Sequence, residues 1–242
     1  MAKEFNYQGE NVMGKIVAAL RRIGFDYIFD TSTAADLTVM EESKEFAQRL
    51  EKGENLPLFT SCCPAWVKYC ENEYPEMLPN VSTCRSPMQM FASVIKEQFG
   101  NKGKKLLSVA VMPCTAKKGE AARDEFKDEN GKPLVDYVIT TQELILMIKE
   151  AGIVFNEIEP ESVDMPFGTM TGAGVIFGVT GGVTEAVIRR VSSDKSIASL
   201  RNLAFEGVRG FGGIKEFELL LDDKTVKICV VNGLKNVAPI ME

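Results

Sequence analysis

Two adjacent cysteines, Cys62 and Cys63, stand in the segment TSCCPAW, where a hydrophobic run gives way to Pro64. A third cysteine, Cys114, follows the apolar run LLSVAVM in the same way and precedes two lysines, in MPCTAKKGE. Nearby cations and the start of a helix favour the thiolate form that a metal needs. A cysteine of this kind, taken alone, is still more often a small buried apolar residue. Metal binding, catalysis and plain burial therefore all remain possible for these thiols.

A second group of residues could move protons. Glu42, Glu45 and Arg49 are spaced i, i+3 and i+7, which places them on one face of a helix. The chain has no histidine, so proton chemistry must use cysteine, carboxylates, lysine or water. The alternative is a solvated helix face with a Glu45–Arg49 ion pair worth about 0.2–0.5 kcal/mol. From these residues alone, the solvated face is the better interpretation.

Helices and strands alternate along the part of the chain that carries these groups, which predicts an α/β fold with parallel strand pairing. The carboxyl ends of parallel strands meet at one edge of a sheet, so the Cys62–Cys63 pair and Cys114 could converge there. The second helix is expected to bury Leu37, Met40, Phe46 and Leu50. The expected elements are helices over residues 9–24 and 34–50, strands over 25–31 and 57–62, helices that begin at Pro64 and Pro87, strands over 106–112 and 136–140, a helix capped by Thr140 and Glu143, irregular chain over 153–171, a helix through Arg190, and a hairpin of 217–221 and 225–233 with its turn at 222–224.

Composition excludes several classes of function. The net charge is −6 and no basic tract is clustered, which argues against a nucleic-acid partner. The first residues lack the apolar core of a signal peptide, and no run approaches the roughly 18 apolar residues of a membrane span. We expect a cytoplasmic chain without a membrane span. Its six cysteines are then expected to be reduced rather than paired in disulfides.

The cysteine segments resemble a known family. TSCCPAWVKYCENEYPEMLPNVSTCRSP and VMPCTAKKGEAAR are similar to two of the three signature stretches of the FeFe-hydrogenase catalytic domain. Further segments resemble the same domain in the same order, so the resemblance covers residues 1–242: GKIVAALRRIGFDYIFDTSTAADLTVMEE, DYVITTQELILMIKEAGI, TGAGVIFGVTGGVTEAVIRR, VRGFGGIKE and VVNGLKN. The resemblance implies two α/β lobes with mixed, largely parallel sheets and a cluster site in the cleft between them. The lobes would comprise residues 1–102 with the C-terminal residues, and residues 103–232.

The cofactor that this resemblance implies is the H-cluster. It consists of a 4Fe-4S cluster that one cysteine sulfur bridges to a two-iron subcluster with CO, CN and azadithiolate ligands. By motif position, Cys63 and Cys114 would ligate the four-iron cluster. Lys117 would hydrogen-bond a cyanide, and Met112 would pack near the bridging carbonyl. The matched residues of the cofactor pocket are Lys117, Met112, Pro113 and Phe177.

The resemblance also gives the carboxylates a role. Cys62 matches the non-ligating thiol that exchanges protons with the bridgehead amine, and the implied relay is Cys62, Glu42, Ser82, Glu45 and Arg49. With the resemblance, this relay is preferred to a solvated face. The implied activity is reversible reduction of protons to dihydrogen, with ferredoxin or a similar electron carrier and with maturation proteins as partners.

The sequence departs from the family pattern in several places. The third signature, a C-x-x-x-C motif with two more cluster ligands, is expected after VVNGLKNVAPIME, and an Ala-Pro stretch is expected before EFNY. We therefore expect a fragment of a longer hydrogenase, truncated at both ends, whose site needs the remaining part of the domain; a second subunit is the alternative source of ligands. Ala65 replaces a commoner glycine and Met88 a frequent glutamine.

Three other functions are alternatives. A hydrogenase-like iron–sulfur assembly protein and a sensory hydrogenase share the fold, but both typically lack a thiol at the position of Cys62. A structural or binding module with buried cysteines is the third. The remaining cysteines, Cys70, Cys84 and Cys229, are expected to bind no metal.

Overall fold

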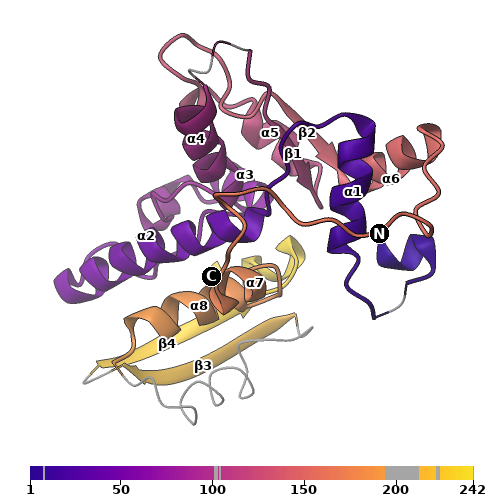
Figure 1. Cartoon of the computed structure of the whole chain (residues 1–242). Helices are drawn as coiled ribbons and strands as arrows, with labels where there is room; N and C mark the ends of the chain where they lie inside the picture. The colour runs from indigo at the N-terminus through magenta and orange to yellow at the C-terminus, as the bar shows by residue number, and fades with distance from the viewer. Residues whose placement is uncertain (8, 101–102, 104, 194–212, 222–223, 242) are drawn as a thin grey trace. The chain divides into compact units, whose positions relative to one another are not determined.

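The computed structural model describes residues 1–7, 9–100, 103, 105–193, 213–221 and 224–241 (Figure 1). The chain forms two compact units. Unit 1 combines Met1–Thr33 with Met88–Thr169, and unit 2 combines Ala34–Pro87 with Met170–Glu242. The lobe boundaries expected from the sequence, near residues 102 and 232, do not coincide with these units and stay a prediction.

Unit 1 is built around a short parallel sheet. Strands β1 and β2 pair in parallel, from Val109 opposite Tyr137 to Met112 opposite Thr140. This pair confirms the predicted α/β class with parallel strands. The elements of unit 1 are η1 (Ala2–Phe5), α1 (Met13–Ile23), α4 (Pro87–Phe99, whose first residue falls in unit 2), β1 (Val109–Met112), α5 (Ala116–Ala121), η3 (Asp124–Phe126), β2 (Tyr137–Thr140) and α6 (Thr141–Glu150).

Helices α1 and α6 form the main core of this unit. Helix α1 ends at Gly24, whose φ of 115° is left-handed and suits glycine. Its residues Val17 and Leu20 pack with Leu144 of α6. Helix α6 begins with the predicted capping box, in which the Thr140 hydroxyl accepts from the Glu143 amide and the Glu143 carboxylate accepts from the Thr140 amide.

Unit 2 contains the long second helix and an antiparallel hairpin. The hairpin pairs from Ile214 opposite Val231 to Leu221 opposite Lys224. Helix α8 lies along it (Figure 1), with Ile188 packed in one core with Leu221. The elements of unit 2 are α2 (Thr31–Lys52, whose first turn falls in unit 1), α3 (Pro64–Glu73), η2 (Pro75–Asn80), α7 (Gly172–Ile176), α8 (Gly182–Val191), β3 (Ile214–Leu221), β4 (Lys224–Val231), η5 (Leu234–Asn236) and α10 (Ala238–Met241).

Some expectations about local structure were wrong. Residues 25–31 do not form a strand, because Asp164 satisfies both backbone groups of Ile28: its carboxylate accepts from the Ile28 amide at 2.7 Å and its amide donates to the Ile28 carbonyl at 2.8 Å. Residues 57–62 form only one bridge, between Phe59 and Val81. Residues 222 and 223 of the expected turn, and 208–212 of VRGFGGIKE, lie outside the described residues.

The buried face of α2 also differs from the expected one. Met40 is 45% exposed. Small and polar side chains take most of the buried positions: Ala34, Ala35, Thr38, Val39, Glu42, Ser43 and Arg49. Because charged residues are rarely buried without a structural or chemical reason, this face is the first candidate for a functional site.

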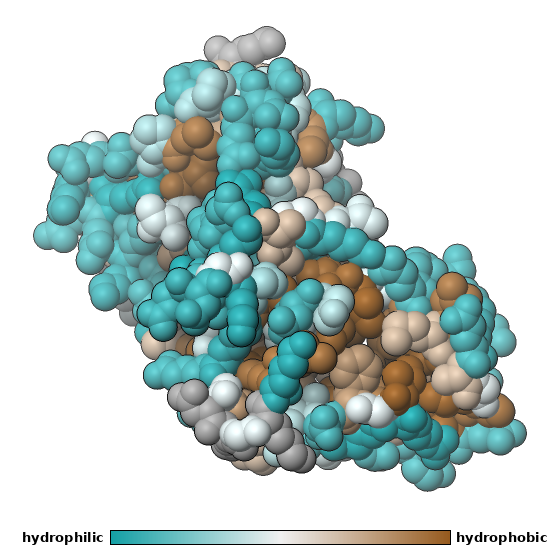
Figure 2. Space-filling view, turned by 90° about the horizontal axis from the view of Figure 1, so that it is seen from above, coloured by the Kyte–Doolittle hydropathy of each residue, from teal (hydrophilic) through white to brown (hydrophobic). Residues whose placement is uncertain are grey.

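The face drawn in Figure 2 is largely hydrophilic, with hydrophobic areas among the hydrophilic residues. The large apolar side chains of unit 1 that are exposed are Tyr27, Leu107, Tyr137, Leu146, Val154 and Met165. Scattered apolar side chains are ordinary on protein surfaces, so none is assigned a role. Among the described residues, no helix is both long and apolar enough to cross a membrane.

Candidate functional site

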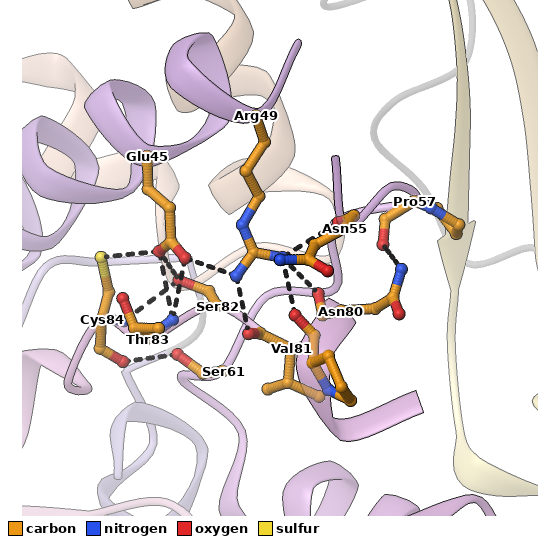
Figure 3. A network of polar contacts seen from close by, with 11 residues as sticks. Glu45, Arg49, Asn55, Pro57, Ser61, Asn80, Val81, Ser82, Thr83 and Cys84 are labelled. Carbon is orange, nitrogen blue, oxygen red and sulfur yellow. Dashed lines mark hydrogen bonds and ion pairs between the residues drawn. The ribbon is translucent and has the colours of Figure 1, made fainter. Parts of the chain in front are cut away.

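Glu45 is the centre of a polar network in unit 2 (Figure 3). Its Oε1 forms an ion pair with Arg49 Nη2 at 2.6 Å, and its Oε2 accepts from the Ser82 hydroxyl at 2.7 Å. The Thr83 amide donates to both oxygens, at 3.2 and 3.1 Å. The structure thus brings together three of the five residues predicted for the relay.

Arg49 ties this network to the neighbouring loop. Besides Glu45, its guanidinium donates to four backbone carbonyls at 3.0–3.2 Å, those of Asn55, Pro79, Asn80 and Val81. The side chain is only 10% exposed. The guanidinium therefore holds the 79–81 segment, and with it the adjacent Ser82, against α2.

Glu42 lies one helical turn before Glu45 and has a different environment. It is 1% exposed, and neither carboxylate oxygen has a hydrogen-bond partner among the described residues. Burial, followed by the negative charge of Glu45, raises the pKa of Glu42 to about 7, although the Ser82 hydroxyl opposes part of this. Glu42 can therefore gain or lose a proton near neutral pH.

The pKa of Glu45 is shifted the other way. Burial alone would raise it, but hydrogen bonds from Ser82, Thr83 and Arg49 outweigh burial and lower it. Two carboxylates on one helix face thus have opposite shifts. Such a divergence is typical of a site where one group exchanges protons and the other stays charged.

Cys84 belongs to the same network, which the sequence analysis missed. Its Sγ lies 3.5 Å from Glu45 Oε2, its amide donates to Ser82 Oγ at 3.2 Å, and its carbonyl accepts from the Ser61 hydroxyl at 2.5 Å. Burial raises the pKa of Cys84 to about 12, with further increases from Glu42 and Glu45. Its thiol is therefore a protonated donor. The signal in the sequence was its position two residues after Ser82.

The predicted thiol pair lies where α3 begins, also in unit 2. Cys63 is the N-cap of α3, with Pro64 in the first turn, and its carbonyl accepts from the Val67 amide at 3.1 Å. Its side chain is exposed, and that of Cys62 is half-buried. Ser61, which precedes Cys62, contacts the Cys84 carbonyl, so the segment with both thiols is connected to the Glu45 network.

Cys114 lies in unit 1, between β1 and α5. Its side chain is exposed, and its Sγ accepts from the Ala116 amide at 3.4 Å. Lys117, the predicted cyanide donor, forms an ion pair with the buried Glu120 at 2.6 Å. The i, i+3 spacing in AKKGE could have predicted this pair. Lys118 also pairs with Glu143 of α6, at 2.5 Å.

The other residues predicted to line the cofactor pocket are divided between the units. Met112 is buried in a core of unit 1 that also contains Met88, and Pro113 next to it is exposed. Phe177 is the half-buried C-cap of α7 in unit 2. Their predicted roles toward a cofactor stay predictions.

Cysteine thiols are the ligand type that an iron–sulfur cluster needs, and the exposed thiols of this chain supply part of such a ligand set. A four-iron cluster needs four thiolates, and the exposed sulfurs of Cys63 and Cys114 are suitable donors. Throughout the described part of the chain, no three Cys, Asp or Glu side chains gather in a metal-binding group. Cys70 is fully buried and donates to the Tyr74 carbonyl. That Cys70, Cys84 and Cys229 bind no metal stays a prediction.

Comparisons with known proteins show which family the chain belongs to. The chain is 46% identical to the NADP-reducing hydrogenase subunit HndD of Solidesulfovibrio fructosivorans, over 97% of this chain and 42% of that protein. It is 31% identical to a probable cytosolic Fe-S cluster assembly factor, GK14772 of Drosophila willistoni, over 100% of this chain and 53% of that protein. The chain thus spans about half or less of the length of these relatives.

The fold is also that of solved hydrogenases. The apo [FeFe]-hydrogenase HydA1 from Chlamydomonas reinhardtii, variant C377H, matches with a TM-score of 0.75 and 33% identity, over 94% of this chain and 66% of that one. Residues 1–242 match the family described as iron only hydrogenase large subunit, C-terminal domain. The chain therefore belongs to the iron-only hydrogenase large subunit family.

Proposed function

We propose that the chain is part of the catalytic domain of an FeFe-hydrogenase that reversibly reduces protons to dihydrogen. The observation that carries this proposal is the burial of Glu42, which raises its pKa to about 7, beside the Glu45–Arg49–Ser82 network. A protein that only holds an iron–sulfur cluster needs no such group. The same unit carries the Cys62–Cys63 pair.

Each predicted residue has a place in this proposal. Cys63 and Cys114 hold two positions of the 4Fe-4S cluster, and the remaining ligands come from the rest of a longer domain. Lys117, Met112, Pro113 and Phe177 shape the pocket of the two-iron subcluster. When bound, the H-cluster would supply the redox chemistry of hydrogen, with electrons that an external carrier delivers.

The chain's own residues handle the proton. The Cys62 thiol would exchange a proton with the bound cofactor, and Glu42 would hold that proton at a carboxylate oxygen before and after the exchange. Arg49 and Ser82 fix the carboxylate of Glu45 beside Glu42. Because these groups are fixed by helix α2 and the loop after η2, the proton follows a defined path.

The partners in this proposal are an electron carrier such as ferredoxin and the maturation proteins that build the cofactor. The cytoplasmic location and the absence of a nucleic-acid partner stay predictions. The second candidate function is iron–sulfur assembly without hydrogen turnover, which the similarity to the Drosophila assembly factor favours. The thiol of Cys62 supports catalysis over assembly, and a sensory role remains the variant of the family with little turnover.

The test uses the complete protein that contains this chain, matured with its cofactor. Hydrogen evolution from a reduced viologen and the iron content are measured for the native protein, Cys62→Ser, Glu42→Gln and the control Cys229→Ser, which alters an exposed thiol. We expect both relay variants to lose at least about tenfold in turnover, a usual loss for a proton-transfer group, with unchanged iron. Native protein that binds iron but evolves no hydrogen would support assembly instead. Full activity in both relay variants would contradict the relay.

A further inference from the structure

Helix α7 (Gly172–Ile176) has a sequence that does not favour a helix. Its five residues, GAGVI, include two glycines and two β-branched residues, all of which are poorer helix formers than alanine. A helix of little more than one turn also gains too few internal hydrogen bonds to be stable by itself. Contacts from outside the helix must therefore keep this segment in its observed form.

Asp36 of helix α2 supplies contacts of this kind. Its Oδ2 accepts from the Thr171 amide at 2.6 Å, and its Oδ1 accepts from the Thr171 hydroxyl at 2.5 Å and from the Gly174 amide at 2.8 Å. The Thr171 hydroxyl in turn accepts from the Ala173 amide at 3.1 Å. One carboxylate, together with the hydroxyl that it fixes, thus binds two amides in the first turn of α7 and the amide of the N-cap residue.

The other end of the segment is fixed by close packing. A Cβ atom added to Gly182, the first residue of α8, would lie 1.7 Å from the Ile176 carbonyl oxygen, so the start of α8 is packed directly against the end of α7. The Gly182 amide also donates to the Val179 carbonyl at 2.7 Å. Phe177 lies between these two attachments, and its own amide donates to the Ala173 carbonyl at 3.2 Å. The position of Phe177 therefore depends on whether α7 is formed.

The contacts of Asp36 are separate from the network of Glu45. Glu42 follows Asp36 by six positions on α2, a spacing that does not return to the same face of a helix. The three hydrogen bonds of Asp36 described above all come from residues 171–174. A substitution of Asp36 therefore changes the attachment of α7 without removing a contact of Glu45 or Arg49.

We propose that Asp36 is a positioning residue for the cofactor pocket: its carboxylate holds residues 172–176 in helical form and thereby sets the position of Phe177. This inference rests on the proposed function for the role of Phe177 in the pocket. The cap itself consists of contacts within the chain. Asparagine has the same shape but cannot replace the aspartate, because it has one acceptor oxygen and its NH2 group would face a donor of residues 171–174.

The first measurement is amide hydrogen exchange, followed by mass spectrometry, in the complete protein that contains this chain and before its cofactor is built. In Asp36→Asn, the amides of residues 172–177 should exchange about fivefold faster or more, since loss of an N-cap usually shifts a helix equilibrium by this factor. The amides of α6, which belongs to unit 1, should keep their native rates, which separates a local effect from a general loss of stability. Glu41→Gln is the matched control, because Glu41 is an exposed carboxylate on the same helix, and it should leave all of these rates unchanged.

Thr171 gives a second set of variants. Thr171→Val removes the hydroxyl, with its contacts to Asp36 and to the Ala173 amide, but keeps both amide contacts of Asp36. Exchange in residues 172–177 should therefore rise by less than in Asp36→Asn, and Thr171→Ser, which keeps the hydroxyl, should have native rates. Native rates in Thr171→Val would overturn the cap, and this result can be obtained even if Asp36→Asn fails to fold.

The second measurement is the infrared spectrum of the matured protein, in which the CO and CN ligands of the proposed cofactor absorb. These vibrations respond to the groups that surround the ligands, so a change in the position of Phe177 should move at least one band in Asp36→Asn. The iron content should stay at the native value, because the substitution alters neither Cys63 nor Cys114. Glu41→Gln should have the native bands.

The outcomes separate this inference from the proposed function. Unchanged exchange in Asp36→Asn, or an equal rise in the amides of α6, would overturn the cap. Faster exchange with native infrared bands would overturn the positioning role and leave the proposed function unaffected. If the bands move in Asp36→Asn but the native matured protein evolves no hydrogen, the positioning role stands and the proposed function fails.

Discussion

Replacing Arg49 by methionine tests whether the guanidinium holds unit 2 together. Arg49 makes five hydrogen bonds of 2.6–3.2 Å, one to Glu45 and four to backbone carbonyls. Methionine keeps the apolar stem of the side chain but removes every donor. The Glu45 carboxylate then lies in a partly buried site without a cation, and the buried Val81 loses the guanidinium contact to its carbonyl.

The expected loss is large for a single substitution. Removing one partner of a buried ion pair usually costs about 3–5 kcal/mol. Each hydrogen bond to a charged group contributes about 1.5–3 kcal/mol, but bonds that share one group do not add. We therefore expect the free energy of unfolding to fall by about 3–5 kcal/mol in Arg49→Met, and by less in Arg49→Lys, which keeps the charge but not the planar fork of donors.

Urea denaturation followed by far-ultraviolet circular dichroism measures this loss. Arg22→Met is the control, because Arg22 is exposed on α1 and has no ion pair among the described residues; it should change stability by less than about 0.5 kcal/mol. The assignment of Arg49 as the anchor of the 79–81 segment would be refuted by either of two results. One is a loss of unfolding free energy in Arg49→Met that is no larger than in Arg22→Met, and the other is an Arg49→Lys chain as stable as the native chain.

Two further predictions concern stability. Burial raises the pKa of Glu42 from 4.5 to about 7, so the folded chain binds a proton at Glu42 more tightly than the unfolded chain does. The stability that this proton contributes is complete below pH 4.5 and is lost as the pH rises through 7. Urea denaturation at pH values from 4.5 to 8.5 should show this fall in the free energy of unfolding of the native chain and a smaller fall in Glu42→Gln. An equal dependence of the free energy of unfolding on pH in the two chains would contradict the burial of the carboxyl. At Gly182, an added Cβ would collide with the Ile176 carbonyl oxygen, whereas Gly178 in the same segment has open space. Gly182→Ala should therefore cost more than about 2 kcal/mol, with Gly178→Ala near native in thermal melting; similar melting temperatures would argue against the close approach.

Local signals in the sequence predicted many of the elements of the fold. The capping box at Thr140, the glycine that ends α1 and the proline that opens α3 are short-range patterns, and each is present in the structure. The failures depend on distant residues. The extended segment at Ile28 is not a strand because Asp164, far away in the chain, satisfies its backbone groups.

The candidate site was predictable to a similar extent. The spacing of Glu45 and Arg49 predicted their ion pair, which the structure contains at 2.6 Å. The burial of Glu42 could not be predicted, because it depends on which side of α2 the folded chain covers. Cys84 was missed for the same reason, since only the folded loop places its thiol beside Glu45.

The two ion pairs of helix α5 have a consequence for metal binding. Lys117 is bound to Glu120 within the helix, and Lys118 to Glu143, whose carboxylate also caps α6. These contacts brace the short helix that follows Cys114 against the start of α6. The backbone that follows Cys114 is thus held by ion pairs of the chain itself. In the proposed role of Cys114 as a cluster ligand, this bracing would reduce the conformational entropy lost at this position on binding.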